Sequence, residues 1–474
     1  MLDDIIQLLR GVKDSHTLAD IYAYVKSKTP PTSNLRCSLC SKPVILTTSG
    51  FTCEDGHGGA EEEVETPAIS LTTDQQLAWD KIQHWLKTDH GIFVLRGFAG
   101  TGKSYLMKML KTLPHNFIFS APTNKAAQIL ASFLGQQCKT TYSVLGLKMT
   151  AEDDQMVLTG GESMPDLGSK PILVIDEAGM IPTFMAKLLA EAVAEQGWRI
   201  IFVGDPAQLN PVGEDRSPVW GLAHPEHRAM LKEVKRFDNQ LLKLATKIRA
   251  VVKDPELKIQ IKPDNDAQEG VFVTSSYEFE QGIKSVTDWS NTKVVVWRNK
   301  TADRYNNLIR KSLGYTDPYH IGERILLAAP VVSDGAILGY TDEELKILEI
   351  DERVFSYPEG GVEAYAMAVE DRHYSLYIPK DPGKLQALLN KRAEYASKQV
   401  GKARKNAWSD YWDMKGTFQS IRYGYAMTAH RLQGSTYETV YVDQIDILAN
   451  RNKRESYRCL YVAATRPTKK FITF

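Results

Sequence analysis

The chain of 474 residues is short of three features that would assign it to a specialised class of protein. Its 58 basic and 58 acidic residues cancel, so no overall positive charge indicates a nucleic-acid partner. Its five cysteines are too few for a disulfide scaffold. No apolar run approaches the roughly 20 residues of a membrane span, and the acidic start Met1–Asp4 lacks the basic and apolar parts of a secretory signal. We therefore expect a cytoplasmic protein without a membrane partner, and any site for a polyanion must be local.

A glycine-rich segment at residues 97–104 is the most informative feature that the sequence does have. It reads Gly-Phe-Ala-Gly-Thr-Gly-Lys-Ser, follows the apolar run 92–95 and precedes a helical pattern at 105–110. This order of strand, glycine loop and helix is typical of the phosphate-binding loop GxxxxGK[ST]. Lys103 would reach the β- and γ-phosphates of ATP, and the Ser104 hydroxyl would hold Mg2+. The expected ATP-binding residues of the loop are Gly97, Ala99, Gly100, Thr101, Gly102, Lys103 and Ser104.

Two further segments carry side chains suited to ATP hydrolysis. The apolar run 172–175 ends in Asp176 and Glu177. We expect Asp176 to hold Mg2+ together with Ser104, and Glu177 to orient or deprotonate the attacking water. Gln208 follows another apolar run and is placed to sense the γ-phosphate. A lone pair of acids after a strand would indicate a solvated loop, but its occurrence together with the glycine loop favours catalysis.

Three cysteines and a histidine near the amino terminus have the spacing of a zinc site. Two residues separate Cys37 from Cys40, and three residues separate Cys53 from His57. A tetrahedral structural zinc ion takes four such ligands, and a closed set of four leaves no open position for catalysis. The alternative is a group of reduced core cysteines that cluster by chance. We expect Cys37, Cys40, Cys53 and His57 to hold a structural Zn2+.

Apolar periodicity divides the first half of the chain into regions. Residues 1–30 have a helical pattern, and residues 59–68 form an acidic stretch that we interpret as a linker. From residue 71 to about residue 222, β-branched runs alternate with helical ones, which predicts parallel strands joined by helices. The expected strands of this part are 92–95, 117–120, 172–175 and 200–203.

A second region of strands and helices follows and is interrupted. The runs 292–297 and 439–442 predict two of its strands. Between them, residues 320–420 contain short apolar runs typical of antiparallel strands, and residues 383–404 have the pattern of one charged helix. Residues 147–166, in the first region, predict a β-hairpin. The sequence therefore predicts an α/β protein with two units, of which the second carries a small inserted domain.

A series of segments resembles the motifs of superfamily 1 helicases, of the RecD-like branch. Asp176–Gly179 and Gly204–Val212 resemble motifs II and III. The remaining segments follow the order of the family. Residues 71–76 resemble the Q motif, 120–127 motif Ia, 140–146 the TIHSLLG segment and 233–236 an arginine-finger motif. Residues 296–300 resemble a strand of the second motor domain, 426–435 motif V and 460–466 motif VI. Tyr142 stands where the family usually has His. The resemblance covers residues 70–474 and is strongest to the phage Dda-type helicases, whereas residues 1–66 lie outside it.

The resemblance implies a fold of two RecA-like P-loop NTPase domains with an SH3-like insertion and a hairpin that acts as a pin. The expected divisions are a helical segment 1–30, a zinc-binding module and acidic linker 31–66, a first motor domain 67–225 with the pin hairpin 147–166, a second motor domain 226–319 and 421–474, and an inserted SH3-like tower domain 320–420. In the pin, Met156, Val157 and Leu158 are candidates for an apolar wedge, and a covering loop is the alternative.

The resemblance also implies roles for individual side chains. Gln75 of the Q motif would contact the adenine edge, and Arg236 and Arg466 would be arginine fingers that reach the γ-phosphate from the second domain. The expected DNA contacts are mostly short polar groups, namely Pro122, Thr123, Asn124, Thr141, Ser143, Asn299, Thr428, His430 and Gln433. For His430, a satisfied core histidine is the alternative.

Together these features predict an ATP-dependent DNA helicase that moves along single-stranded DNA and unwinds duplexes, with 5′ to 3′ polarity taken from the resemblance alone. The expected cofactors are ATP, Mg2+ and structural Zn2+. The expected partners are single-stranded DNA, fork junctions and, through residues 1–66, replication or recombination proteins. We expect a monomer in the cytoplasm of a bacterial or phage-infected cell. Three alternatives remain open: an RNA helicase of the same superfamily, a zinc-bearing adaptor with a weak motor, and a P-loop ATPase that remodels proteins.

Overall fold

The computed structural model describes three strands within residues 1–70, and residues 71–474 apart from 153–154, 161–166, 169, 234–239, 258, 267 and 334–335. The chain divides into two compact units, Met1–Ser70 and Leu71–Phe474. Within the described residues, no helix has the length and apolar character that crossing a membrane requires.

The first unit contains a small antiparallel sheet that the sequence did not predict. Its strands are β1 (Val44–Thr47), β2 (Gly50–Cys53) and β3 (Gly58–Gly59), in the order β1-β2-β3. The helical segment expected over residues 1–30 and three of the expected zinc ligands, Cys37, Cys40 and His57, lie outside the described residues. Cys53 is the last residue of β2.

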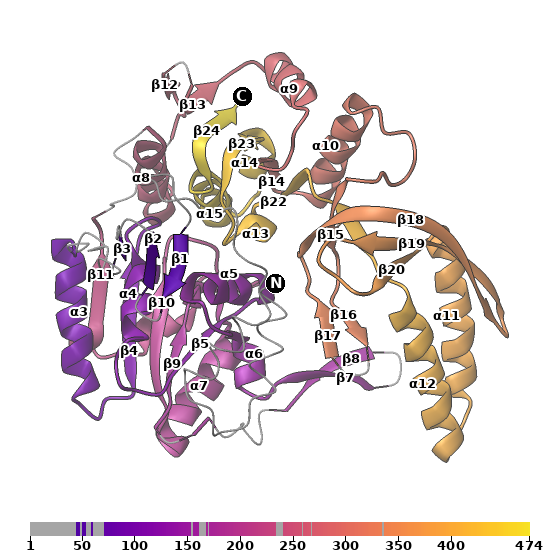
Figure 1. Cartoon of the computed structure of the whole chain (residues 1–474), viewed down its shortest axis with the longest axis horizontal. Coiled ribbons are helices and arrows are strands. Elements are labelled where there is room, and N and C mark those ends of the chain that lie inside the picture. The colour runs from indigo at the N-terminus through magenta and orange to yellow at the C-terminus, as the bar shows by residue number, and fades with distance from the viewer. Residues whose placement is uncertain are drawn as a thin grey trace. The chain divides into compact units, whose positions relative to one another are not determined.

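The second unit begins with a parallel sheet of six strands in the order β11-β4-β10-β9-β5-β6 (Figure 1). The strands are β4 (Ile92–Gly97), β5 (Phe117–Ala121), β6 (Lys139–Thr140), β9 (Ile172–Ile175), β10 (Arg199–Gly204) and β11 (Arg228–Leu231). The four strands predicted from the sequence are therefore confirmed, and the parallel α/β class is confirmed with them.

Alternating side chains explain why helices cover both faces of this sheet. Phe93 and Leu95 of β4 pack in one core with apolar residues of α3, α4 and α5, whereas Val94 packs in another with residues of α6 and α7. The helices are α3 (Thr73–Leu86), α4 (Lys103–Leu110), α5 (Asn124–Leu134), α6 (Thr141–Val144) and α7 (Thr183–Gln196). Three short 3-10 helices also belong to this region: η1 (Ala178–Met180), η2 (Pro218–Gly221) and η3 (Pro225–His227).

The edge strand β11 corrects one expected boundary. We expected the second motor domain to begin at residue 226, but Arg228–Leu231 pairs in parallel with β4 of the first sheet. An isolated four-residue strand carries no local signal for the sheet that it joins, because pairing is decided by tertiary contacts.

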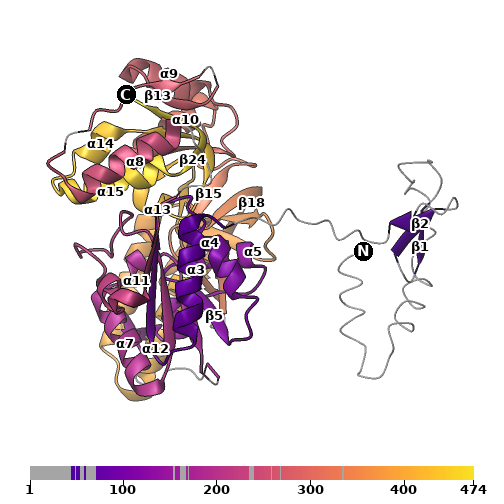
Figure 2. The ribbon, with the colours of Figure 1, turned by 90° about the vertical axis from the view of Figure 1, so that its left-hand side faces the viewer.

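A second sheet has the order β12-β13-β24-β23-β14-β22, in which every pairing except β12 with β13 is parallel. Its strands are β12 (Asp264–Asn265), β13 (Gly270–Val273), β14 (Thr292–Val296), β22 (Ala426–Thr428), β23 (Tyr437–Val442) and β24 (Pro467–Thr473). One face packs on α8 (Gln240–Lys253), α13 (Ala429–Leu432), α14 (Gln444–Leu448) and α15 (Lys453–Ala464). The other packs on α9 (Ser276–Ser285) and α10 (Asn299–Ser312). Figure 2 shows α8 and α15 side by side.

An insertion lies in the chain between α10 and β22. It contains an antiparallel sheet in the order β20-β19-β18-β15-β21 and a separate pair, β16 and β17. The strands are β15 (Arg324–Leu327), β16 (Val331–Ser333), β17 (Ala336–Gly339), β18 (Glu344–Tyr357), β19 (Gly360–Val369), β20 (Ser375–Pro379) and β21 (Ile421–Tyr423). Antiparallel strands were expected here, and the structure confirms them.

Two helices replace the single charged helix expected over residues 383–404. They are α11 (Pro382–Ser397) and α12 (Gly401–Thr417), and they pack against each other. Gly401 has φ +56°, a left-handed conformation that suits glycine, and it allows the chain to reverse direction there. Apolar residues of both helices, including Leu388 and Met414, then share one core.

A β-hairpin projects from the first sheet, as the sequence predicted. It consists of β7 (Lys148–Glu152) and β8 (Gln155–Thr159), which pair in antiparallel register with Glu152 opposite Gln155 (Figure 1).

Candidate functional site

The glycine loop has the backbone shape that phosphate binding requires. β4 ends at Gly97 and α4 begins at Lys103. Gly100 and Gly102 between them have φ values of +78° and +83°, which are strained for any residue with a side chain. Lys103 Nζ donates to the carbonyl oxygens of Gly97 at 2.8 Å and Phe98 at 2.9 Å. The lysine side chain therefore folds back onto the backbone of the glycine loop. It lies at the start of α4, where an anion is favoured.

Gln75 of α3 holds this loop in place through a hydrogen bond to its backbone. Its Oε1 accepts from the backbone N–H of Thr72 in a capping box at the start of α3, and its Nε2 donates to the Thr101 carbonyl at 2.9 Å. A Cβ atom at Gly102 would lie 2.3 Å from Gln75 Nε2, so the glutamine also requires glycine at that position. Gln75 is 3% exposed, with both ends of its amide engaged within the chain. In this structure Gln75 braces the loop, and the expected contact with adenine would require it to change partners.

The two acids after β9 differ in their surroundings. Asp176 follows the buried strand directly, and its Oδ1 accepts from the N–H of Glu177 at 2.9 Å. Glu177 has φ +50°, a conformation that turns the chain sharply after the strand. Burial, together with the charge of Glu177, raises the pKa of Asp176 to about 7, although the Lys103 charge opposes the shift. A carboxylate whose pKa is raised in this way is suited to a divalent cation, which restores its charged form.

A cavity of about 220 Å³ joins the two sheets at this point. The first sheet contributes residues of the glycine loop, both acids and Gln208, and the second contributes residues of α8 and α15 and of the segments that follow α13 and α15. The lining residues used below are Ser104, Asp176, Glu177, Gln208, Arg249, Tyr461 and Arg466.

Arg466, one of the two predicted arginine fingers, lines this cavity. The residue is 6% exposed, and its guanidinium donates to Thr465 Oγ1 and to the carbonyl oxygens of Val462 and Ser435. Burial lowers the pKa of Arg466, and the charge of Glu177 across the cavity acts in the opposite direction. The second predicted finger, Arg236, lies outside the described residues.

The loop that follows β10 is attached to α15 by contacts that the sequence analysis missed. The Tyr461 hydroxyl donates to Asp205 Oδ2 at 2.7 Å. Arg458 Nη1 donates to the carbonyl oxygens of Pro206, at 2.6 Å, and Gln208. A signal was available, because Tyr461 lies in the segment 460–466 that resembles motif VI, and Arg458 stands about one helical turn before it. Gln208 Oε1 is buried and has no hydrogen-bond partner, which leaves an acceptor directed at the cavity region.

Gln433 is placed differently from the prediction. We expected it to contact DNA, but its Nε2 donates to Glu177 Oε2 at 3.2 Å, and the side chain is 9% exposed. The residue thus connects the second sheet to the expected catalytic acid. Its own Oε1 is buried without a hydrogen-bond partner.

Arg249 of α8 is another cavity residue that the sequence analysis missed. Its guanidinium carbon lies 3.2 Å from the centre of the Phe98 ring, a cation–π contact with the glycine loop. Arg249 therefore places a second cation from the second sheet at the cavity.

Several predicted DNA contacts are buried or already engaged. Thr141 is fully buried, and its hydroxyl lies 3.4 Å from that of Ser120. Pro122 is also buried, and Thr428 is 6% exposed. These three positions do not offer a side chain to a strand in this structure. Thr123 Oγ1 accepts from the Ala126 N–H and caps α5.

Other predicted contacts do reach the surface. Ser143 is exposed, and Asn124 is half-buried at the start of α5. His430 Nε2 lies 3.6 Å from Glu455 Oε1, and burial lowers the pKa of the imidazole. Lys125 Nζ donates to the Arg431 carbonyl at 3.2 Å, so α5 of the first sheet and α13 of the second meet here. Asn124 and His430, one from each sheet, thus lie on adjoining elements.

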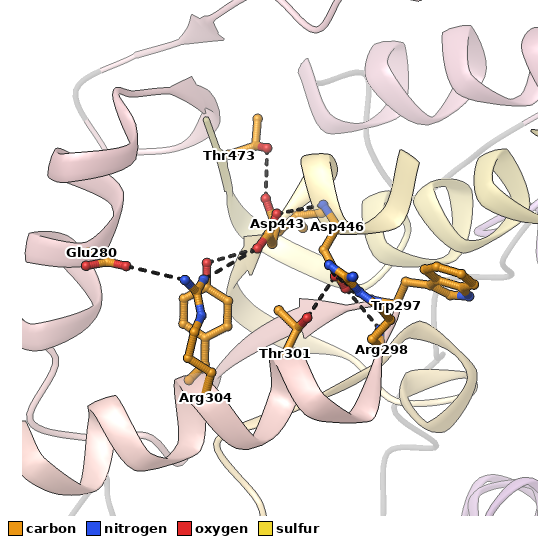
Figure 3. Close-up of polar contacts among 10 residues, drawn as sticks. Glu280, Trp297, Arg298, Thr301, Arg304, Asp443, Asp446 and Thr473 are labelled. Carbon is orange, nitrogen blue, oxygen red and sulfur yellow. Dashed lines mark hydrogen bonds and ion pairs between the residues drawn. The ribbon is translucent and has the colours of Figure 1, made fainter. Parts of the chain in front are cut away.

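A carboxylate of the chain holds the start of α10, where Asn299 lies (Figure 3). Asp446 Oδ2 accepts from the N–H groups of Trp297 and Arg298, and Oδ1 accepts from Arg298 Nε and the Thr301 hydroxyl. Burial alone would raise the pKa of Asp446, but these hydrogen bonds lower it below its usual value. The network fixes the turn that presents Asn299, whose Oδ1 accepts from Arg422 at 3.4 Å.

Two protein families and several known proteins are similar to this chain. The AAA domain family matches residues 70–261, and the UvrD-like helicase C-terminal domain family matches residues 423–472. The chain is 26% identical to the uncharacterized protein R530 of Acanthamoeba polyphaga mimivirus, over 84% of this chain and 99% of that one. It is also 26% identical to the ATP-dependent DNA helicase dda of Enterobacteria phage T4, over 84% of this chain and 97% of that one. A solved structure of two Pif1 helicases at forked duplex DNA covers 85% of this chain, and the match spans 92% of that chain at 14% identity and a TM-score of 0.49.

The site and the similarities point to one family. A glycine loop, two acids and a buried arginine from the second sheet surround one cavity. A UvrD-like helicase family matches residues 423–472, and the similarity to dda extends over 84% of this chain and 97% of dda. The chain is a superfamily 1 helicase of the Dda-like group.

Proposed function

We propose that this helicase, an ATP-dependent enzyme that acts on DNA, moves 5′ to 3′ along a single strand and separates the duplex ahead of it. The observation that carries the proposal is the cavity that Ser104 and Glu177 of the first sheet line together with Arg466 of the second. A nucleotide held there contacts both sheets, so its hydrolysis changes the force between them. We take the first motor domain to run from residue 67 through β11, and the insertion to include β15 to β21.

The cavity residues divide the work of hydrolysis. The Ser104 hydroxyl and the Asp176 carboxylate offer the oxygen ligands that Mg2+ prefers. Lys103 and Arg466, with Arg236 as a second finger, offset the negative charge that develops on the γ-phosphate. Glu177 orients the attacking water, and Gln433 holds Glu177 in place from the second sheet.

Contacts between the sheets transmit the state of the nucleotide. The loop after β10 carries Gln208, and Tyr461 and Arg458 fasten that loop to α15. α15 is followed by Arg466, so one helix links the sensor loop to the arginine finger. Loss of the γ-phosphate removes an anion between these cations and allows the sheets to separate.

We infer that the strand passes over the exposed polar groups where α5 meets α13. Thr123, Asn124 and Ser143 on the first sheet, and Asn299 and His430 on the second, are the side chains assigned to it. The hairpin β7–β8 is assigned to splitting the base pairs at the fork.

We also propose that Cys37, Cys40, Cys53 and His57 hold a structural Zn2+. Cys53 ends β2, and His57 immediately precedes β3, so these two ligands flank one short connection of the sheet. Residues 1–66 would then form a module that contacts DNA or a replication or recombination protein.

The experiment uses forked duplexes with a 5′ or a 3′ single-stranded tail, incubated with the full chain, ATP and Mg2+. We expect unwinding with the 5′ tail only, and ATP hydrolysis that single-stranded DNA stimulates more than RNA. Unwinding of the 3′-tailed duplex alone would contradict the polarity, and stronger stimulation by RNA would favour an RNA helicase. Removal of residues 150–160 should preserve DNA-stimulated hydrolysis and impair unwinding; unchanged unwinding would contradict the pin assignment.

A further inference from the structure

Histidines gather at the edge of the first sheet opposite the glycine loop. His90 lies two residues before β4, and Glu226 and His227 end η3, directly before β11. β4 and β11 are neighbouring parallel strands, so the segments that lead into them meet at one edge. Among the residues that the structure describes, His90, Glu226 and His227 are the one group of three whose potential metal ligands all lie within 4.8 Å of one another.

The buried ring of His227 gives this cluster the character of a binding site. Its side chain is 4% exposed, and its Nε2 has no hydrogen-bond partner. Glu226 Oε1 lies 3.4 Å from that nitrogen without the geometry of a hydrogen bond. Around a tetrahedral zinc ion with bonds of about 2.0–2.1 Å, neighbouring ligand atoms stand roughly 3.3–3.4 Å apart. The spacing of these two atoms therefore fits a shared metal ion, which would also satisfy the buried nitrogen.

We propose that His90, Glu226 and His227 form a site for Zn2+ or a similar divalent transition-metal ion. Two imidazoles and one carboxylate suit zinc, whereas Mg2+ prefers oxygen ligands alone. The rings of His90 and His227 have their centres 4.4 Å apart, and His90 and Glu226 are exposed, so small rotations bring them onto an ion. His224, whose Nδ1 lies 3.2 Å from Glu226 Oε1, is the candidate for a fourth ligand.

An ion at this site would tie the start of β4 to the start of β11. β4 has six residues, so roughly 20 Å of strand separates the site from the glycine loop. The metal therefore contacts no nucleotide; it stabilises the pairing of an edge strand that leads toward Arg236. The site shares no residue with the zinc ligands proposed near the amino terminus, and it goes beyond the proposed function.

The test uses the full chain with Zn2+ alone as the probe. Bound zinc is measured by competition with a chromophoric chelator for wild type, His90→Gln and Glu226→Gln, with His373→Gln in an exposed turn of the insertion as the matched control. We expect wild type and control to bind one equivalent more than the two variants, or to bind that equivalent at least about tenfold more tightly. Zn2+ should also raise the Tm of wild type and control by more than that of the variants.

Equal zinc stoichiometry and affinity in wild type, His90→Gln and Glu226→Gln would overturn the proposal. Both substituted side chains are exposed, so the fold should persist, and DNA-stimulated ATP hydrolysis by each variant confirms it. Because that activity is measured separately, failure of the metal site is distinguishable from failure of the helicase assignment.

Discussion

The two six-stranded sheets differ in what occupies the start of a helix that follows one of their strands. After β4, the chain forms a glycine loop in which Lys103 donates to two loop carbonyls and α4 begins. After β14, the corresponding place at the start of α10 is taken by Asp446, which accepts four hydrogen bonds from Trp297, Arg298 and Thr301. At the first sheet, the start of α4 is shaped to bind an anion from outside the chain. At the second, the Asp446 carboxylate is the anion at the start of α10.

This difference fits the proposal that two sheets of similar construction share one nucleotide. The second sheet needs no phosphate to complete α10. Arg466 and Tyr461 from its side line the cavity, and Gln433 donates to Glu177, which also lines it. In the proposed function, the first sheet binds and hydrolyses the nucleotide, and the second reports the state of the site. The predictions below test that division, beginning with the largest expected effect.

Replacement of Lys103 should remove the phosphate contact of the first sheet. We expect Lys103→Ala to reduce DNA-stimulated ATP hydrolysis by about 100- to 1,000-fold, because one cation at the γ-phosphate has that weight in a shielded site. Steady-state ATPase assays measure the change, and Lys108→Ala, an exposed lysine of the same helix, is the control. Hydrolysis by Lys103→Ala at the wild-type rate would mean that the glycine loop is not the nucleotide site.

Replacement of Asp446 should lower the stability of the second sheet, because this carboxylate holds the start of α10. We expect Asp446→Asn to lower the free energy of unfolding by about 1.5–3 kcal/mol, because a buried charged acceptor of four hydrogen bonds is weakened. Urea unfolding measures this, with exposed Asp303→Asn in α10 as the control. Equal stability of the two variants would contradict the role given to Asp446.

The raised pKa of Asp176 predicts a pH effect at the first sheet alone. With a pKa of about 7, the group is protonated below that pH, and protons then compete with Mg2+. Between pH 8 and pH 6, the Mg2+ concentration that half-saturates binding of a fluorescent ATP analogue should rise roughly tenfold.

Glu177→Gln is the matched variant for this pH measurement. It removes the neighbouring charge that raises the pKa of Asp176, so the midpoint of the pH effect should move to lower pH. The ATP analogue titrates identically in both proteins, so the difference belongs to the chain. An unchanged midpoint would contradict the coupling of the two acids.

The smallest effect is expected at the link between the sheets. Tyr461→Phe removes one hydrogen bond to Asp205 and should reduce DNA-stimulated hydrolysis by about two- to tenfold, with basal hydrolysis less affected. Tyr457→Phe on the same helix is the control. Equal loss of basal and stimulated rates would place Tyr461 in folding or chemistry and not in communication.

The sequence predicted what depends on local pattern and missed what depends on packing. The glycine loop, the Asp176–Glu177 pair and the strands before them follow from short motifs, and each was found where expected. Thr141 and Ser143 are two residues apart on one short helix, and only tertiary packing decides that the first is buried and the second exposed.

Contacts between the sheets were also beyond local reasoning. Gln433 lies 256 positions from Glu177 along the chain, and no local signal pairs them. The break before Gly401 did have a signal, a glycine within a helical pattern, which the single-helix interpretation overlooked.

The most direct test of the account compares the binding of a non-hydrolysable ATP analogue and of ADP to wild type and Arg466→Gln. If one nucleotide is held between the sheets, the variant should bind the ATP analogue at least about tenfold more weakly, because it loses the charged contact to the γ-phosphate. Its affinity for ADP should remain within about twofold of wild type, which also shows that it folds. Unchanged binding of the ATP analogue, or an equal loss for both nucleotides, would contradict the claim that the second sheet senses the γ-phosphate through Arg466.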